Sequence, residues 1–223
     1  MTNRLTLIQK IRKGLSYFYY PYNKLFRSSE TFEFRGKKYN YFFHLYNATW
    51  RSERAVEIPI VMDIIKKYQG KKILELGNVL PHYYPFEHDV LDKYDKSKKV
   101  IRQDVVDFKT EKRYDLIVSI STIEHIGWDE EPRDSTKLGK TIEVLKGCLS
   151  PGGKIVITFP QGYNSVLDEL DKSEKLQFTE KYCLIRVTRN NLWKEIPWSR
   201  DCNKKFGKPY NNANALIVGI INV

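Results

Sequence analysis

The sequence predicts an α/β protein in which a doubly wound, mostly parallel sheet follows a small N-terminal arm. From about Glu53 onward, short apolar segments alternate with stretches that have helical periodicity. These apolar segments are nearly continuous runs, which is typical of strands buried on both faces of a parallel sheet. The links between them are short, as in right-handed crossover connections. We therefore expect a domain over residues 53–223 and an arm over residues 1–52.

The overall composition indicates a globular chain with a substantial core. Its 223 residues are 41% hydrophobic, which is enough for one large domain or one domain with an appended arm. No apolar run approaches the roughly 18 to 20 residues of a membrane span, and the first residues do not read as a secretory signal. The three cysteines are far apart and form no CxxC pair, so we expect reduced thiols in the cytoplasm. The four histidines show no metal-binding spacing, and we predict no metal site.

The arm begins with a basic segment of helical periodicity, and we expect this helix to end at Pro21. Such a helix can make peripheral contact with an anionic membrane, or it can pack on its own domain or on the second subunit of a homodimer. Packing is the better prediction, but all three remain open. The next segment, TFEFRGKKYNYFFHLY, alternates around Gly36 and predicts a short hairpin. The apolar positions of the helix are Leu5, Ile8, Ile11, Leu15 and Phe18.

Within residues 53–223 the helices and strands are expected in a regular order. Residues 54–69 have a helical period, and Gly70 is a suitable C-terminal stop. The segment KKILELG is expected to be the first strand of the sheet. Further strands are expected at residues 88–92, 100–104, 114–120, 154–159, 184–188 and 215–223, with a helix at 136–149 and the turn LSPGG closing it. A long polar connection joins the last two strands, which predicts an antiparallel pair at one edge of the sheet.

Acidic side chains follow the first three predicted strands. Glu75 and Gly77 end the first strand, Asp92 the second and Asp104 the third. Ligands of such sheets bind outside the carboxyl ends of the strands. A carboxylate after the second strand can accept hydrogen bonds from both hydroxyls of a ribose, and one after the third can accept from the amino group of adenine. The sequence has no GxGxxG or GxxxxGK[ST] phosphate loop, so a nucleoside without a pyrophosphate fits better than NAD or ATP.

The order and spacing of these segments resemble the class I S-adenosylmethionine-dependent methyltransferases. The matching segments are ILELGN, VLDKYD, IRQDVVDF, YDLIVSISTIEHI and LSPGGKIVITFP. Three strings, LELGNVLPHY, STIEHIGWDE and FPQGYN, are similar to an uncharacterised subgroup found with surface-polysaccharide and glycosyltransferase genes. The resemblance covers the chain from about Glu53 to its C-terminus. It implies a Rossmann-like, seven-stranded sheet with an antiparallel last strand, S-adenosyl-L-methionine as cofactor and S-adenosyl-L-homocysteine as product.

The resemblance also implies which residues hold the cofactor. Glu75 would order the first loop, Gly77 would allow backbone contact, and Asp92 would bind the ribose, with Asp95 as the alternative if the alignment shifts by one residue. The remaining implied residues are Asp104 with the amide of Val105 for adenine, against Asp107 as a rival, and Ser119 and Ser121 beside the methionine part. The family pattern E/D-x-G-x-G-x-G is E-L-G-N-V-L-P in this chain. Because asparagine tolerates positive φ, we expect Asn78 to replace one glycine in part.

The acceptor side is expected after the fourth and fifth strands. His125 could take a proton from a substrate hydroxyl, because the ordinary histidine pKa of roughly 6.5 suits a base near neutrality, or it could only hold the loop. Trp128, Tyr163 and Asn164 are candidates for substrate binding, with ordinary packing as the alternative. We expect a small acceptor. The association of the similar subgroup with surface-polysaccharide and glycosyltransferase genes suggests that the methyl group goes to a hydroxyl of a sugar or glycan precursor.

Two other classes of function stay open from the sequence. The missing glycines of the first loop are compatible with a catalytically silent scaffold or regulatory protein that keeps the fold. The formal charge of +11 and the aromatic arm are compatible with an RNA-binding or RNA-modifying protein. Most lysines, however, are spread beside acids or apolar residues, as on a solvated surface. Nucleic acid is therefore not our first prediction for a partner; a small-molecule or glycan-precursor substrate is.

Overall fold

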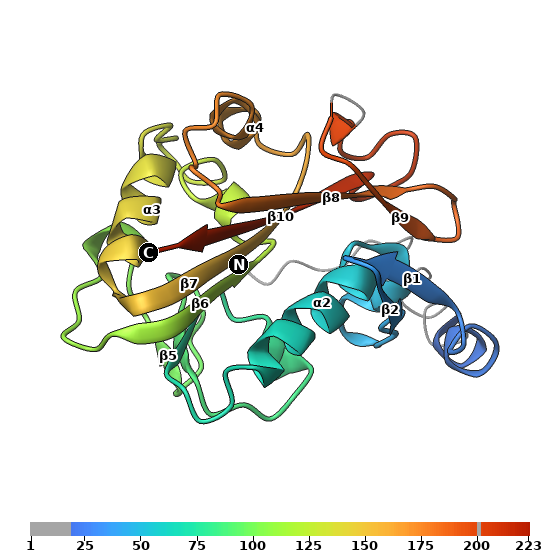
Figure 1. The fold of residues 1–223 in the computed structure, drawn as a ribbon, viewed down its shortest axis with the longest axis horizontal. Helices are drawn as coiled ribbons and strands as arrows, with labels where there is room; N and C mark the ends of the chain where they lie inside the picture. The colour runs from blue at the N-terminus through green and yellow to red at the C-terminus, as the bar shows by residue number, and fades with distance from the viewer. Residues whose placement is uncertain (1–18, 200–201) are drawn as a thin grey trace.

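The central sheet of the computed structural model, which describes residues 19–199 and 202–223, has eight strands within those ranges (Figure 1). Their order across the sheet is β5-β4-β3-β6-β7-β10-β8-β9. The first five strands of this sheet in chain order, β3 to β7, are parallel to one another, and β10 lies antiparallel between β7 and β8. This confirms the predicted doubly wound, Rossmann-like architecture with an antiparallel last strand. The strands are β3 (Ile73–Leu76), β4 (Asp89–Leu91), β5 (Val100–Ile101), β6 (Tyr114–Ile120), β7 (Leu149–Pro160), β8 (Glu180–Arg186), β9 (Trp193–Ile196) and β10 (Ala215–Asn222).

The predicted number of seven strands is wrong by one, because β9 extends the sheet beyond β8. This strand lies in the connection that the sequence showed only as polar. It pairs antiparallel with β8, from Cys183 opposite Ile196 to Arg186 opposite Trp193. Its four residues are too few for a clear alternating pattern. As a result the β8–β10 pair is antiparallel as predicted, but β9 and not this pair forms the edge.

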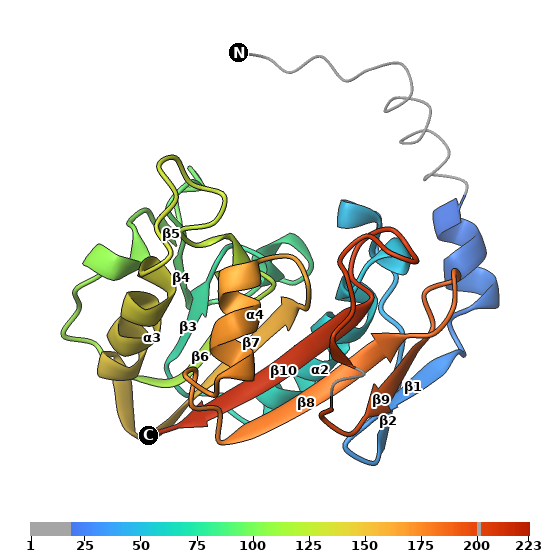
Figure 2. The same cartoon turned by 90° about the horizontal axis from the view of Figure 1, so that it is seen from above.

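Helices cover both faces of the sheet (Figures 1 and 2). The helix α2 (Arg54–Lys66) lies on one face, where Ile58 packs in one cluster with Val118 of β6. On the other face, Ile117 shares a cluster with Ile142 of α3 (Lys137–Gly147) and Leu167 of α4 (Ser165–Lys172). Neighbouring residues of β6 thus face opposite layers, as a doubly covered strand requires. The sequence predicted α2 and α3 but not α4.

The turn predicted for LSPGG is part of the long strand β7 instead. The register with β6 shifts here, because Tyr114 lies opposite Leu149 while Leu116 lies opposite Lys154. The extra residues form a bulge, in which Gly152 has a left-handed φ of +75°. The glycines of LSPGG therefore bend the chain as predicted, but β7 pairs with β6 on both sides of the bend. The predicted third strand is similarly shortened to β5, and Val105–Asp107 form a short 3-10 helix, η3.

The hairpin predicted in the arm is confirmed as β1 (Thr31–Phe34) and β2 (Lys37–Asn40). Phe32 and Phe34 are buried in one cluster with Val56 of α2 and Trp193 of β9. A 3-10 segment, η1 (Tyr46–Arg51), then leads into α2. The hairpin thus shares a core with the domain, while the boundary between residues 52 and 53 stays a prediction.

The predicted N-terminal helix falls mostly outside the described residues, which begin at Tyr19. Residues 19–26 are helical, so the prediction that Pro21 ends the helix is wrong. A proline fixes φ near the helical value and removes one N–H donor, so the turns that follow it can still form. In the described ranges, no helix has the length and apolar character needed to cross a membrane. Cys148, Cys183 and Cys202 are buried and free.

Candidate active site

A cavity of about 320 Å³ lies at the carboxyl ends of β3, β4, β5 and β6. Its position is the one expected for a ligand of a doubly wound sheet. The predicted site residues that line it are Gly77, Asn78, Asp92, Asp104, Val105, Ser121 and His125. The structure therefore brings together, at one edge of the sheet, side chains that are far apart in the sequence.

Glu75 does not line the cavity but orders the loop beneath it. Its side chain is fully buried, and Oε1 accepts hydrogen bonds from the backbone N–H groups of Val79 (2.9 Å) and Leu80 (2.8 Å). Its other oxygen lies 2.6 Å from Nε2 of His88. The segment after Gly77, where the methyltransferase pattern has further glycines, thus folds around a buried carboxylate and enters the short 3-10 helix η2 (Leu80–His82). This gives the glycine-poor loop a defined path.

Gly77 is the one residue of this loop that needs the freedom of glycine. Its φ is +88°, and a β-carbon there would lie 2.2 Å from Oγ1 of Thr122. The prediction that Asn78 replaces a glycine through positive φ is wrong, because its φ is not positive. The loop turns at Gly77 alone and then continues with negative φ angles at Val79 and Tyr83. Asn78 instead donates from Nδ2 to Asp95 Oδ2 (2.9 Å).

Asp92, and not its alternative Asp95, lines the cavity. Oδ1 of Asp92 accepts from the backbone N–H groups of Tyr94 (2.8 Å) and Asp95 (2.9 Å), and Oδ2 accepts from the N–H of Asn78 (3.2 Å). These bonds fix the carboxylate in place and leave Oδ2 with capacity for a ligand. The carboxylate of Asp95 instead accepts hydrogen bonds within the loop, from Ser97 and Asn78. These bonds lower the pKa of Asp95 to about 2.

Asp104 lines the cavity, and its rival Asp107 does not. The sequence did not reveal that two lysines pair with Asp104. Its Oδ2 lies 2.6 Å from Nζ of Lys137 and 2.9 Å from Nζ of Lys93, and Glu130 contacts the same two ammonium groups at 2.5 and 3.0 Å. Burial acts to raise the pKa of Asp104, but the bonds from Lys137 and Lys93 outweigh it and lower the pKa. Oδ1 accepts only one hydrogen bond, from the N–H of Val106 at 3.3 Å, and is therefore the oxygen more available to a ligand.

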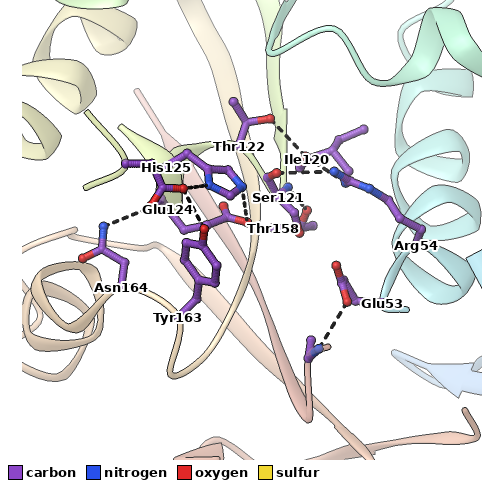
Figure 3. A network of polar contacts seen from close by, with 12 residues as sticks. Glu53, Arg54, Ile120, Ser121, Thr122, Glu124, His125, Thr158, Tyr163 and Asn164 are labelled. Carbon is purple, nitrogen blue, oxygen red and sulfur yellow. Dashed lines mark hydrogen bonds and ion pairs between the residues drawn. The ribbon is translucent and has the colours of Figure 1, made fainter. Parts of the chain in front are cut away.

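His125 is held by Asp129 and Tyr163. Its Nδ1 lies 2.5 Å from Oδ2 of Asp129, and the hydroxyl of Tyr163 donates to the same oxygen (2.6 Å). The rings of His125 and Tyr163 meet edge to face at 4.9 Å (Figure 3). Because a carboxylate only accepts, Nδ1 carries the hydrogen, and in the neutral form of the imidazole Nε2 would be the acceptor. Burial acts to raise the pKa of Asp129, but its bonds from Tyr163 and His125 lower it.

Arg54 is a site residue that the sequence reasoning missed. It lines the cavity, and its guanidinium donates to the backbone oxygens of Ile120 (2.8 Å) and Ser121 (3.3 Å) just after β6 (Figure 3). It also pairs with Glu57 at 3.1 Å. Oγ of Ser121 donates to the other oxygen of Glu57 at 2.5 Å. The start of α2 therefore fixes the backbone where β6 opens into the cavity.

Besides Glu75, four of the predicted residues do not line the cavity: Ser119, Trp128, Tyr163 and Asn164. Ser119 is buried inside β6. Trp128 packs its ring against the guanidinium of Arg133 at 4.3 Å. Asn164 is buried: its Oδ1 caps α4 by accepting from Val166 and Leu167, and its Nδ2 donates to the backbone oxygen of Glu124 (2.8 Å). With both ends of its amide used, Asn164 has a structural role in place of the predicted substrate contact.

No protein-family model and no curated protein matches the chain. Among solved structures, an S-adenosylmethionine-dependent methyltransferase from Archaeoglobus fulgidus is 16% identical over 80% of this chain and 98% of that chain, with a TM-score of 0.48. The N-methyltransferase NodS from Bradyrhizobium japonicum, in complex with S-adenosylhomocysteine, is 11% identical over 72% of this chain and 84% of that one, with a TM-score of 0.45. A possible histamine N-methyltransferase from Thermotoga maritima is 12% identical over 67% and 81%, with a TM-score of 0.42. These likenesses are distant and do not by themselves identify the family of the chain.

Proposed function

We propose that the protein is an S-adenosylmethionine-dependent methyltransferase that acts on a small acceptor, a sugar or glycan precursor with a reactive hydroxyl. The observation that carries this proposal is the convergence of Gly77, Asp92, Asp104 and His125 on one cavity at the carboxyl ends of four strands. This convergence supports a nucleoside-type cofactor beside a base. The sugar-like acceptor rests on the sequence resemblance alone, and the cytoplasmic location stays a prediction.

The residues of the cavity fit such a cofactor. Its volume lies at the lower end of the roughly 300–1,000 Å³ that is common for small-molecule sites. Apolar side chains, among them Leu91 and Val105, can enclose a purine, while Asp92 and Asp104 supply acceptors for the ribose hydroxyls and the adenine amino group. Gly77 lets the backbone approach the methionine part without a β-carbon in the way.

The cofactor supplies a methyl group that its sulfonium already activates, so positioning provides much of the rate. We assign to Asp92 and Asp104 the holding of the nucleoside and to Arg54 the fixing of the backbone at Ser121. His125 would take the proton of the acceptor hydroxyl on Nε2 as the hydroxyl oxygen bonds to the methyl carbon. The cofactor, which Asp92 and Asp104 would hold, would supply the methyl group, keep the electron pair of the carbon–sulfur bond on sulfur and leave as S-adenosylhomocysteine. Asp129 keeps the imidazole in the tautomer that this step needs.

Calorimetric titration of the purified protein with S-adenosylhomocysteine tests the proposal. We expect binding, and we expect Asp92→Asn to weaken it by about tenfold or more, equivalent to at least 1.4 kcal/mol. Asp107→Asn is the matched control, because Asp107 is exposed and does not line the cavity. Absence of binding by the wild-type protein at millimolar ligand would refute the cofactor assignment.

A further inference from the structure

The helix of residues 19–26 turns its apolar side chains to the outside of the molecule. It lies at the outer end of the structure, beyond β1 and away from α3 (Figures 1 and 2). Leu25 and Phe26 are 73% and 71% exposed, and Tyr19 and Tyr22 are about half exposed. Such a group of large apolar side chains on the surface marks an interaction site more often than a solvated face. We name these four residues the apolar face of the helix.

The side of this helix that faces the protein is polar. Asn23 is only 3% exposed, its Nδ2 donates to the backbone oxygen of Tyr19 (2.6 Å), and its Oδ1 accepts from Arg27 (2.8 Å). Arg27 in turn pairs with Glu30 at 2.7 Å and donates to the backbone oxygen of Asn190 (2.8 Å). A surface helix ordinarily buries its apolar stripe and exposes its polar residues. Here the arrangement is reversed, and a network of hydrogen bonds on the polar side holds it so.

The reversal also bears on the prediction that the N-terminal helix packs its apolar stripe on its own domain. In the described residues, Tyr20 does pack against Trp50 of η1, with ring centroids 5.9 Å apart. The apolar face, however, points away from the domain. The sequence continues the same pattern upstream at intervals of three and four residues, although those positions lie outside the described residues: Ile8, Ile11, Leu15 and Phe18 precede Tyr22 and Leu25.

The cations beside the apolar face lack acidic partners. Lys24 is exposed, with Nζ 5.7 Å from the centre of the Tyr20 ring, and the guanidinium of Arg51 lies 5.6 Å from the centre of the Tyr19 ring. Within residues 19–199 and 202–223, neither Lys24 nor Arg51 forms an ion pair with a carboxylate. The first 27 residues contain no Asp or Glu and have these basic residues: Arg4, Lys10, Arg12, Lys13, Lys24 and Arg27.

This distribution of charge decides between the possible occupants of the apolar face. A second copy of the chain would bring two basic segments together without acids to pair with, which opposes association. An anionic lipid surface instead offers an apolar layer below a layer of negative charge. Tyrosine, phenylalanine and leucine beside lysine and arginine are the side chains that favour the boundary between lipid and water.

We propose that the helix of residues 19–26 docks the protein on the surface of an anionic membrane. Tyr22, Leu25 and Phe26 enter the boundary between headgroups and acyl chains, and Lys24 and Arg51 contact the lipid phosphates. The helix lies in the plane of the interface and does not cross the membrane. The proposal goes beyond the proposed methyl transfer and does not depend on it, because none of these residues lines the cofactor cavity.

Co-sedimentation of the full chain with lipid vesicles tests this proposal. We expect binding to vesicles rich in phosphatidylglycerol, little binding to vesicles of phosphatidylcholine alone, and weaker binding as salt is added. Absence of binding to the anionic vesicles would overturn the proposal. Equal binding to both kinds of vesicle would overturn it as well, because the cations would then contribute nothing.

The double variant Leu25→Gln/Phe26→Gln tests whether the apolar face makes the contact. We expect it to weaken vesicle binding by about tenfold or more, because two large side chains no longer enter the lipid. Lys24→Gln should weaken binding by about fivefold. Val223→Gln is the matched control, since Val223 is an exposed apolar residue at the other end of the molecule (Figure 2). Unchanged vesicle binding in the double variant would place the contact elsewhere and overturn the proposal.

Two further measurements on the same samples complete the test. Melting temperatures check that the variants are folded, which we expect because Leu25 and Phe26 are exposed. Sedimentation velocity without lipid gives the oligomeric state. A dimer that is lost in the double variant, together with no vesicle binding, would show that a second copy covers the apolar face. A wild-type monomer that binds no vesicles would leave that face to residues 1–18 or to water, and either result would overturn the proposal.

Discussion

Gly77 and Thr122 touch where the loops after β3 and β6 cross, at a distance that leaves no room for a β-carbon on residue 77. A β-carbon there would lie 2.2 Å from Oγ1 of Thr122, and the φ of +88° is unfavourable for any other residue. We expect Gly77→Ala to lose most S-adenosylhomocysteine binding in calorimetry and to lower the free energy of unfolding by about 1–3 kcal/mol. Adding Thr122→Gly should recover part of the loss, because it removes the clash but not the strain. An unchanged affinity in Gly77→Ala would contradict the role of this crossing.

The buried carboxylate of Glu75 should be a main source of stability for the first loop. Glu75→Ala removes the acceptor for two backbone N–H groups and the partner of His88. We expect a loss of about 3–5 kcal/mol in urea unfolding, as for other broken buried pairs. Glu75→Gln should cost less, since its amide oxygen can still accept from the loop. Glu111→Ala, at an exposed position, is the control and should have little effect.

Lys137 should tune the recognition of adenine through Asp104. Its side chain is 7% exposed, and its ammonium holds both Asp104 and Glu130. If Asp104 reads the amino group of adenine, the wild-type protein should bind adenosine more tightly than purine riboside, which lacks that group. Lys137→Met should reduce this discrimination because Asp104 loses a partner that positions it. Lys140→Met, an exposed position on the same helix, should keep it.

Asp129 should fix the tautomer of His125. In the wild-type protein, Nε2 is expected to be the unprotonated nitrogen, which long-range ¹H–¹⁵N NMR of labelled histidine can detect. Asp129→Asn can donate to Nδ1 and should therefore move the hydrogen to Nε2. Loss of an oriented base is expected to lower methyl transfer by about 100-fold, with S-adenosylhomocysteine affinity little changed. The same NMR signature in both proteins would show that Asp129 does not set the tautomer.

The sequence was sufficient for the parts of the site that follow directly from strand ends. Asp92 and Asp104 each stand one to three residues after a strand, so parallel pairing alone brings them to the same edge. The pairing of Asp104 with Lys137 joins residues 33 positions apart and has no local signal. Asn164 did carry a local signal, since an asparagine before SVLDEL is a typical N-cap, and this pattern would have given both α4 and its structural role. The path of the first loop could not be read locally, because it depends on a buried contact between Glu75 and His88.

Glu124 should make the free protein less stable as pH rises. Its neighbours are Glu53, Glu57 and Arg54 from the start of α2, His125 beside it and Tyr163 from the loop after β7. Because burial raises its folded pKa well above the unfolded value, folding favours the protonated acid. The stability that this acid provides is present below the unfolded pKa and is lost as pH rises through the interval up to the folded pKa. Glu124→Gln stays neutral, so we expect it to unfold at a higher temperature than the wild-type protein at neutral pH, with the difference shrinking towards acidic pH. A melting temperature that falls at neutral pH would mean that Glu124 is already paired in the folded protein.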